Sequence, residues 1–185
     1  MFELVEDVIK QELRENEELL WCAQPKQGIL IRGSDYFMIP FSIMWGGFAI
    51  FWEVGVITTG APFFFAIFGA PFVLVGLYIM FGRFLVDEQL RKKTYYGITN
   101  KRIIIISGLF NRRIKSLDPT LITDLSVSEK PDGKGTIFFG QRNPWNWFDG
   151  MPMLGMEQYN VPKLEFVDNA RDVYDLIEKV KSGEK

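Results

Sequence analysis

Two long uncharged runs dominate the pattern of hydrophobic and polar positions along the chain. No residue between Asp35 and Glu53 is charged, and no residue from Val54 to Gly82 is charged. A helix needs about 20 mostly apolar residues to cross a hydrocarbon core about 30 Å thick. The pattern therefore predicts a transmembrane helical hairpin over residues 35–84, with helices at about 35–54 and 62–84. Buried core helices of a soluble protein are the alternative.

The residues that flank the hairpin predict its orientation. Lys26 and Arg32 precede the first run and Arg83 follows the second, whereas the connecting turn has Glu53 and neither Lys nor Arg. Cytoplasmic loops carry the excess of Lys and Arg in membrane proteins. We therefore expect a multi-pass protein with both termini in the cytoplasm.

Small and polar residues inside the hairpin predict its packing and its one ionisable site. Ser42 with Gly46, and Ala66 with Ala70, have the four-residue spacing of small residues that lets two helices approach closely. Glu53, near the end of the first helix, is the only ionisable residue available for a channel or transport role.

The first 34 residues read as a cytosolic amphipathic helix followed by a lead-in to the membrane. Phe2, Val5, Ile9 and Leu13 recur at helical spacing in an acidic stretch. The stretch has no basic start and no small-residue cleavage site, so it is not expected to be a signal peptide. Its acidic side chains could pair with basic residues of the same chain or of a neighbouring subunit.

Residues 94–167 follow a pattern of short strands separated by turn signals. The strands that this pattern predicts are Tyr95–Thr99, Arg102–Ser107, Arg113–Leu117, Ile122–Glu129, Thr136–Phe139 and Lys163–Val167. Asn100-Lys101 is expected to form the turn of the first strand pair. Asp168 or Asn169 caps a closing helix with apolar residues at helical spacing.

These elements together predict an α+β fold. A two-helix transmembrane hairpin (residues 35–84) is followed by a cytoplasmic domain (residues 85–185), a small β-barrel or sheet capped by a C-terminal helix. Within its second strand, Ile103 to Ile106 do not alternate with polar residues. Such a strand is covered on both faces. The second cover could be a neighbouring element, another subunit or the membrane, and Ile103 and Ile105 are therefore interface candidates.

Composition excludes several kinds of chemistry. The chain has no histidine, and Cys22 is its only cysteine. A zinc site wants several such ligands, and general acid–base catalysis most often uses histidine. No nucleotide-binding or catalytic motif is present, so neither an enzyme nor a cofactor or metal site is predicted. A net charge of −2 gives no overall attraction to nucleic acid.

Charge is nevertheless unevenly distributed. Residues 89–117 contain eight basic residues and no acidic one. Basic residues beside a membrane attract anionic lipid headgroups. The lipid-headgroup candidates are Arg91, Lys92, Lys93, Lys101, Arg102, Arg112, Arg113 and Lys115. A solvated face that only obeys the positive-inside rule is the alternative.

The segment Gly140–Gln158 is turn-like but rich in large apolar side chains. Such a patch marks either a contact surface or a segment that folds back on its own domain or the membrane. The residues of this second interface candidate are Trp145, Trp147, Phe148, Met151, Met153 and Leu154.

The stretch YGITNKRIIIISGLFNRRIKSLDPTLITDLSVSEKPDGKGTIFFG, from Tyr96 to Gly140, resembles the bacterial pleckstrin-homology-like domain family. The marks of this resemblance are Tyr96, Thr99, Arg102, Gly108, Leu121, Asp124 and the late stretch Gly133–Gly140. The chain also resembles the membrane-anchored subset of this family, in which two transmembrane helices precede the domain.

The resemblance implies a fold and a class of role. Domains of this kind bind lipids, peptides or other proteins, and some bacterial members assemble into rings. The expected function is a membrane-tethered, non-enzymatic binding or scaffolding module of the bacterial inner membrane that self-associates into a homo-oligomer. An anionic-lipid sensor or an accessory subunit of a membrane transporter is the alternative.

Overall fold

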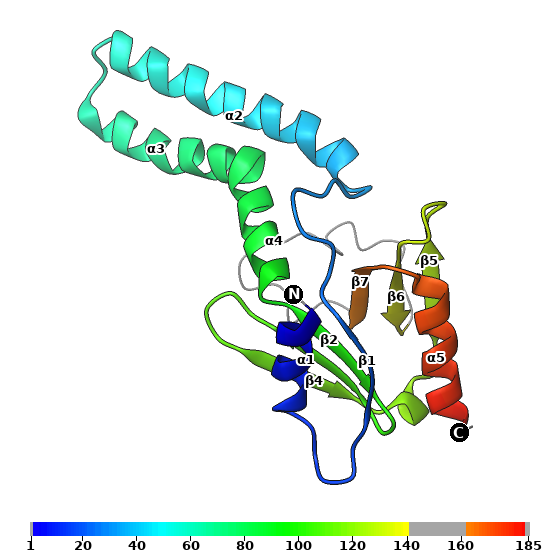
Figure 1. Ribbon diagram of the computed structural model, residues 1–185. Coiled ribbons are helices and arrows are strands. Elements are labelled where there is room, and N and C mark those ends of the chain that lie inside the picture. The colour runs from blue at the N-terminus through cyan, green and yellow to red at the C-terminus, as the bar shows by residue number, and fades with distance from the viewer. Residues whose placement is uncertain (1, 141–161, 184–185) are drawn as a thin grey trace. The chain divides into compact units, whose positions relative to one another are not determined.

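The computed structural model describes residues 2–140 and 162–183, which form two compact units (Figure 1). Unit 1 contains residues 2–28, 88–140 and 162–183, and unit 2 contains residues 29–87. The N-terminal segment, expected as a lead-in to the membrane, thus belongs to the same unit as the strands that follow the hairpin.

Unit 2 is built on the expected pair of apolar helices. Helix α2 covers Asp35–Thr58, and α3 covers Phe63–Leu77. A π-helical turn, Tyr78–Gly82, joins α3 to α4, Arg83–Lys92. Two helices, Asp35–Thr58 and Phe63–Lys92, are long and apolar enough to cross a membrane. Both extend beyond the limits predicted from the sequence. The first continues through residues 55–58, which the sequence placed in the turn, and the second continues through charged residues as far as Lys92.

Glycines set the closest approach of α2 and α3. A Cβ atom on Gly76 would lie 2.9 Å from the Cα atom of Gly46, so the two backbones touch here. Ser42 and Gly46 are buried in this interface, as their spacing predicted. The other predicted pair was wrong, because Ala70 is exposed and α3 packs through Gly69 and Gly76.

Charged side chains lie at both ends of this helix pair. At one end Arg83 Nη1 and Asp35 Oδ1 are 2.5 Å apart, and both side chains are buried. Arg32 pairs with Asp87 beside them, at 2.8 Å. At the other end the Glu53 carboxyl lies in the notch left by the missing side chain of Gly69. Glu53 therefore faces α3 rather than the surroundings of the hairpin.

The described part of unit 1 contains two antiparallel sheets, the helices α1 and α5, and the end of α4. The first sheet has the order β1-β2-β3-β4: Leu19–Ala23, Tyr95–Thr99, Ile103–Ser107 and Arg113–Leu117. The second has the order β5-β6-β7: Leu125–Glu129, Gly135–Phe139 and Lys163–Val167. Helix α1 is Phe2–Lys10, a 3-10 turn covers Pro119–Leu121, and α5 is Ala170–Ser182. The α+β class is confirmed, while the described strands form no closed barrel.

Strand β1 was not predicted. Its sequence, LLWCA, has neither polar alternation nor a turn signal in front of it, and it was read as a lead-in. It pairs antiparallel with β2, with Trp21 opposite Ile98 and Ala23 opposite Tyr96. The apolar hairpin is therefore inserted between two adjacent strands of one sheet.

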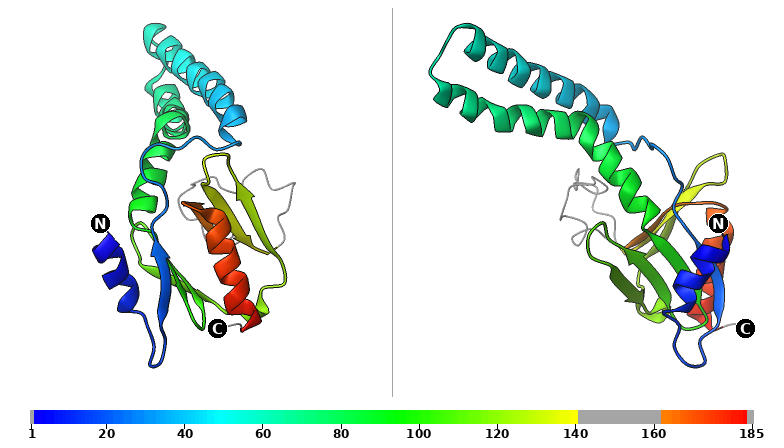
Figure 2. Two further views of the ribbon diagram at one scale, coloured as in Figure 1. Left: turned by 45° about the vertical axis from the view of Figure 1, so that its right-hand side comes forward. Right: turned by 60° about the vertical axis from the view of Figure 1, so that its left-hand side comes forward.

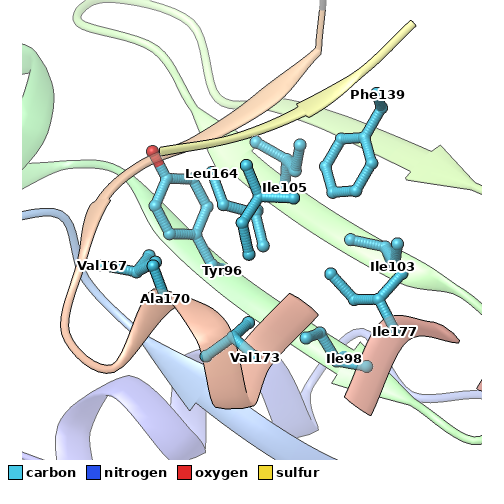
Figure 3. Packing of buried hydrophobic residues seen from close by; sticks show 11 residues of the cluster. Tyr96, Ile98, Ile103, Ile105, Phe139, Leu164, Val167, Ala170, Val173 and Ile177 are labelled. Atoms are coloured by element: carbon cyan, nitrogen blue, oxygen red, sulfur yellow. The ribbon is translucent and has the colours of Figure 1, made fainter. Parts of the chain in front are cut away.

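The main core of unit 1 lies between the sheets and α5 (Figure 3). Ile98, Ile103 and Ile105 face this core from the first sheet. Val173 and Ile177 of α5 close it from the other side, because their spacing puts them on one face of the helix. Ile103 and Ile105 are therefore buried inside their own domain, and the prediction that they form an interface was wrong.

The opposite face of the first sheet is covered by α1, so that α1 and α5 lie on either side of β1 (Figure 2). Ile104 and Ile106 pack there with Ile9, which is fully buried. Close packing requires Gly97 on β2, since a Cβ atom at this position would lie 2.7 Å from a methyl group of Ile9. The second face of the strand that carries the four isoleucines is thus covered by α1 of the same chain.

Candidate functional site

The predicted basic surface is divided by the structure, because Arg91 and Arg102 are largely buried while most of the others are exposed. The Nε and Nη2 atoms of Arg102 donate to the two carboxylate oxygens of Glu17 at 2.8 and 3.0 Å. Thr99 Oγ1 donates to the same carboxylate at 2.8 Å. The Arg102 side chain is 12% exposed and that of Glu17 is 0% exposed. Arg102 therefore joins the N-terminal segment to the β2–β3 turn and does not face solvent.

This arrangement changes the acidity of Glu17. The hydrogen bonds from Arg102 lower the pKa of the Glu17 carboxyl to about 2, against burial, which acts in the opposite direction. The backbone N–H of Arg14 and the hydroxyl of Thr99 also lower this pKa. The carboxylate is thus held ionised by its partners.

Arg91 is also buried and is hydrogen-bonded to the backbone of its own unit. Its guanidinium donates to the carbonyl oxygens of Lys26 and Gly28, each at 2.6 Å. Gln27 and Gln24 return hydrogen bonds to the carbonyls of Arg91 and Lys92. We call Gln24–Gly28 together with Arg91 and Lys92 the clasp. The clasp ties the segment after β1 to the segment before β2, at the base of the inserted hairpin.

The remaining candidates are more exposed. Lys92 pairs with Glu88 at 2.8 Å. Arg112 pairs with Glu12 at 2.9 Å and stays half-exposed, so the N-terminal acids do pair with basic residues of the same chain. Lys101 and Arg113 are exposed and Lys115 is half-buried. None of these last three forms an ion pair with another residue in the described part of the chain.

A feature missed at the sequence level lies at the β3–β4 turn. Phe110 is 83% exposed, and the Leu109 carbonyl beside it accepts a hydrogen bond from Lys93 Nζ at 2.8 Å. Arg112 and Arg113 follow directly. We call Leu109, Phe110, Arg112, Arg113 and Lys93 the basic tip. Its signal in the sequence is an apolar pair between a glycine and two arginines, GLFNRR.

A groove of about 900 Å³ runs between the edge of β1 and α5. Seven consecutive residues, Trp21–Gln27, line one wall, and successive residues of α5 on one side of the helix line the other. Trp21, Cys22 and Ala23 of this wall belong to the edge strand β1. The other four residues follow the strand, and the Lys26 N–H among them donates to the Phe166 carbonyl at 3.1 Å. The charged residues of the groove are Lys26, Lys134, Lys179, Asp168, Asp172 and Asp175.

The groove has features that suit a polypeptide ligand. Strand β1 pairs only with β2 among the described strands, which leaves its other edge toward the groove. The Gln27 Oε1 atom is buried and accepts no hydrogen bond within the described residues. Unpaired strand edges recognise extended peptides through their backbone groups. Four residues of this wall, Gln24–Gln27, also belong to the clasp.

The described residues hold no group of three or more Asp, Glu, Cys or His side chains that could bind a metal ion. Burial, followed by the charge of Glu6, raises the pKa of the Cys22 thiol. A raised pKa leaves the thiol protonated and unreactive.

The interface candidates of the insert lie outside the described residues. They are Trp145, Trp147, Phe148, Met151, Met153 and Leu154.

Comparison of the chain with known proteins identifies no relative. No protein-family model matches the chain, and no curated protein and no solved structure matches it.

Proposed function

We propose that the protein is a membrane-tethered, non-enzymatic binding or scaffolding module of the bacterial inner membrane. Its domain is of the pleckstrin-homology-like kind, and both termini are cytoplasmic. The observation that carries the proposal is the insertion of an apolar helix pair between β1 and β2 of one sheet. Two chain connections, joined to each other by the clasp, then hold the binding domain to its membrane anchor.

The family assignment rests on two supports. One is the set of motifs from Tyr96 to Gly140 described above. The other is the element order, in which two antiparallel sheets are followed by a C-terminal helix that packs into the core between them. A fold of this kind does not define a ligand by itself, so the ligand has to be argued from the surfaces.

The groove is the binding surface that this function uses. An extended segment of a protein partner would pair with the β1 edge and place its side chains between Trp21 and Leu176. Binding there would contact residues of the clasp, which join the two chain segments that lead into and out of the apolar hairpin. The domain would act as a scaffold, because it performs no chemistry on the segment.

Photo-crosslinking in cells tests this role. A photoreactive amino acid replaces Lys26, an exposed residue of the groove wall, and Leu121, which is 78% exposed and outside the groove, is the matched control position. We expect one defined protein adduct from position 26 only, lost when Ala23→Trp fills the groove. Equal adducts from both positions, or adducts that survive Ala23→Trp, would contradict the proposed role.

Self-association and orientation are tested separately. Native mass spectrometry of the detergent-extracted protein should give a homo-oligomer, and a monomer at all concentrations would remove this part of the proposal. For orientation, Thr59→Cys in a Cys22→Ala background places one thiol in the turn of the hairpin. A membrane-impermeant maleimide should label this thiol in intact spheroplasts.

An anionic-lipid sensor is a second candidate, favoured by the exposed cations of the basic tip and by Lys101 and Lys115. An accessory role in a transporter has a narrower basis. The Glu53 carboxyl faces α3 inside the helix pair, and its Oε2 atom has no hydrogen-bond partner among the described residues. If Glu53→Gln leaves flux through an associated transporter unchanged, this role is excluded.

A further inference from the structure

The basic tip combines three properties that rarely meet on a solvated turn. Its aromatic ring is almost fully exposed, the residue before it is apolar, and cations surround it. The turn is tight, since Gly108 has a φ of +129° and a side chain there would collide with the Asn111 carbonyl. Phe110 therefore projects from a constrained turn.

The basic tip contains three basic side chains, and one acidic side chain, Glu12, is paired with it. Lys93 holds the turn through a hydrogen bond from its Nζ atom to the Leu109 carbonyl. Arg113 is exposed without an ion pair in the described part of the chain. Arg112 is partly neutralised by Glu12 and is the weaker member. The sequence from Gln89 to Leu117 contributes no acidic side chain.

Exposure alone does not distinguish Phe110 from other apolar residues of the domain. Leu121 is 78% exposed, close to the value for Phe110. It follows Asp118, whose carboxylate accepts hydrogen bonds from the backbone and hydroxyl of Thr120. Single exposed apolar residues are normal on protein surfaces. An apolar side chain flanked by cations is instead complementary to a binding partner that has an anionic surface and an apolar interior.

We propose that the basic tip docks on an anionic lipid bilayer, with Phe110 entering the boundary between headgroups and acyl chains. Arg113 and Lys93 lie against lipid phosphates, and Arg112 joins them to the extent that Glu12 releases it. The charges of the tip and the bilayer are complementary, since a bilayer rich in anionic lipid attracts basic segments within about one Debye length. The inference rests on the proposed membrane tether, which keeps the bilayer within reach of the domain.

Spin-label accessibility in the full-length protein tests the proposal. Because Cys22 is the only cysteine, Cys22→Ala with Phe110→Cys gives one labelled site at the tip. The protein is reconstituted into phosphatidylcholine alone, or into equal parts of phosphatidylcholine and phosphatidylglycerol. We expect the label to collide more with oxygen and less with a water-soluble nickel chelate in the anionic bilayer. Raising the salt concentration should reverse this shift.

Two matched variants complete the test. A label at Leu121→Cys should show the same accessibility in both bilayers, and Arg113→Glu in the Phe110→Cys protein should abolish the shift. A label at position 110 that stays open to the nickel chelate in both bilayers would overturn the proposal. So would a label that is immobilised yet still open to the chelate, because that result indicates a protein partner.

Failure of the tether can be told apart from failure of the tip. Phe51 is an exposed residue of α2, and a label at Phe51→Cys should be in contact with oxygen and shielded from the chelate in either bilayer. A label at Phe51→Cys that is open to the chelate would refute the membrane tether. Shielding at position 51 with none at position 110 would refute only the docking of the tip.

Discussion

Arg102 and Glu17 form a bidentate ion pair although they lie 85 positions apart in the sequence. The apolar hairpin lies between them in the sequence. The pair fixes the segment before β1 to the turn between β2 and β3. It is supported by Thr99, which bonds to the Glu17 carboxylate, and by the Glu12 carbonyl, which accepts from Arg102. The two chain segments on either side of the apolar hairpin are thus joined by a buried polar network.

Removing one partner of this pair should destabilise the protein strongly. Arg102→Gln leaves a buried carboxylate without its cation, and breaking a buried pair in this way costs about 3–5 kcal/mol. Thermal unfolding of the detergent-solubilised protein should show a clearly lower midpoint. Arg113→Gln removes an exposed cation and is the control, with an expected change within about 0.5 kcal/mol. Equal midpoints for the two variants would show that Arg102 is not structural.

The acidity of Glu17 predicts how stability depends on pH. The folded-state pKa is about 2 and the ordinary value is 4.5. The ionised carboxylate therefore contributes its full stabilisation above about pH 4.5, and this contribution is lost as the pH falls toward 2. Its size is about 3 kcal/mol at 1.36 kcal/mol for each pKa unit.

Denaturant unfolding from neutral pH to below pH 4.5 checks this dependence. The wild-type protein should lose stability over this range, and Glu17→Gln should lose less because its side chain does not titrate. Parallel curves for the two proteins would mean that other carboxyls carry the acid sensitivity.

The strands that were predicted correctly are those whose limits depend on neighbouring residues in the sequence. Strands Tyr95–Thr99, Arg113–Leu117 and Lys163–Val167 were predicted with their correct limits, because turn signals flank them. Strand β1 was missed because its place in the sheet depends on pairing with β2, more than 70 residues later. The apolar hairpin in between hides this relationship from any local pattern.

The binding residues were harder to predict for the same reason. A sequence gives the charge of Arg91 and Arg102 but not their partners, so it makes both residues lipid-headgroup candidates. Their burial follows from carbonyls of the clasp and from Glu17, which the fold brings together. Phe110 was overlooked because its exposure depends on the turn geometry, although the apolar pair before two arginines was visible.

Packing of α1 on the first sheet predicts a large effect at Ile9. This side chain is fully buried against Ile104 and Ile106, and the missing side chain of Gly97 gives it room. Truncation to alanine in such a position costs about 2–5 kcal/mol. Ile9→Ala should therefore lower the unfolding midpoint, whereas Leu4→Ala, on the exposed side of α1, should not.

An equal loss at both positions would indicate a general effect of helix propensity rather than packing on the sheet. Hydrogen exchange gives an independent measurement. In Ile9→Ala the amides of β3 should exchange faster, because one cover of that strand is weakened.

The contact between Gly46 and Gly76 predicts how the helix pair responds to a larger side chain. The backbones of α2 and α3 touch at this point, so Gly76→Leu must push the helices apart. Overpacking of a tight interface costs about 1–3 kcal/mol, and a leucine here separates two backbones. Gly47→Leu is the matched control, because nothing lies within 4 Å of a side chain placed there. Thermal unfolding in detergent should show a lower midpoint for Gly76→Leu and an unchanged one for Gly47→Leu; the reverse order would mean that α2 and α3 do not pack through these glycines.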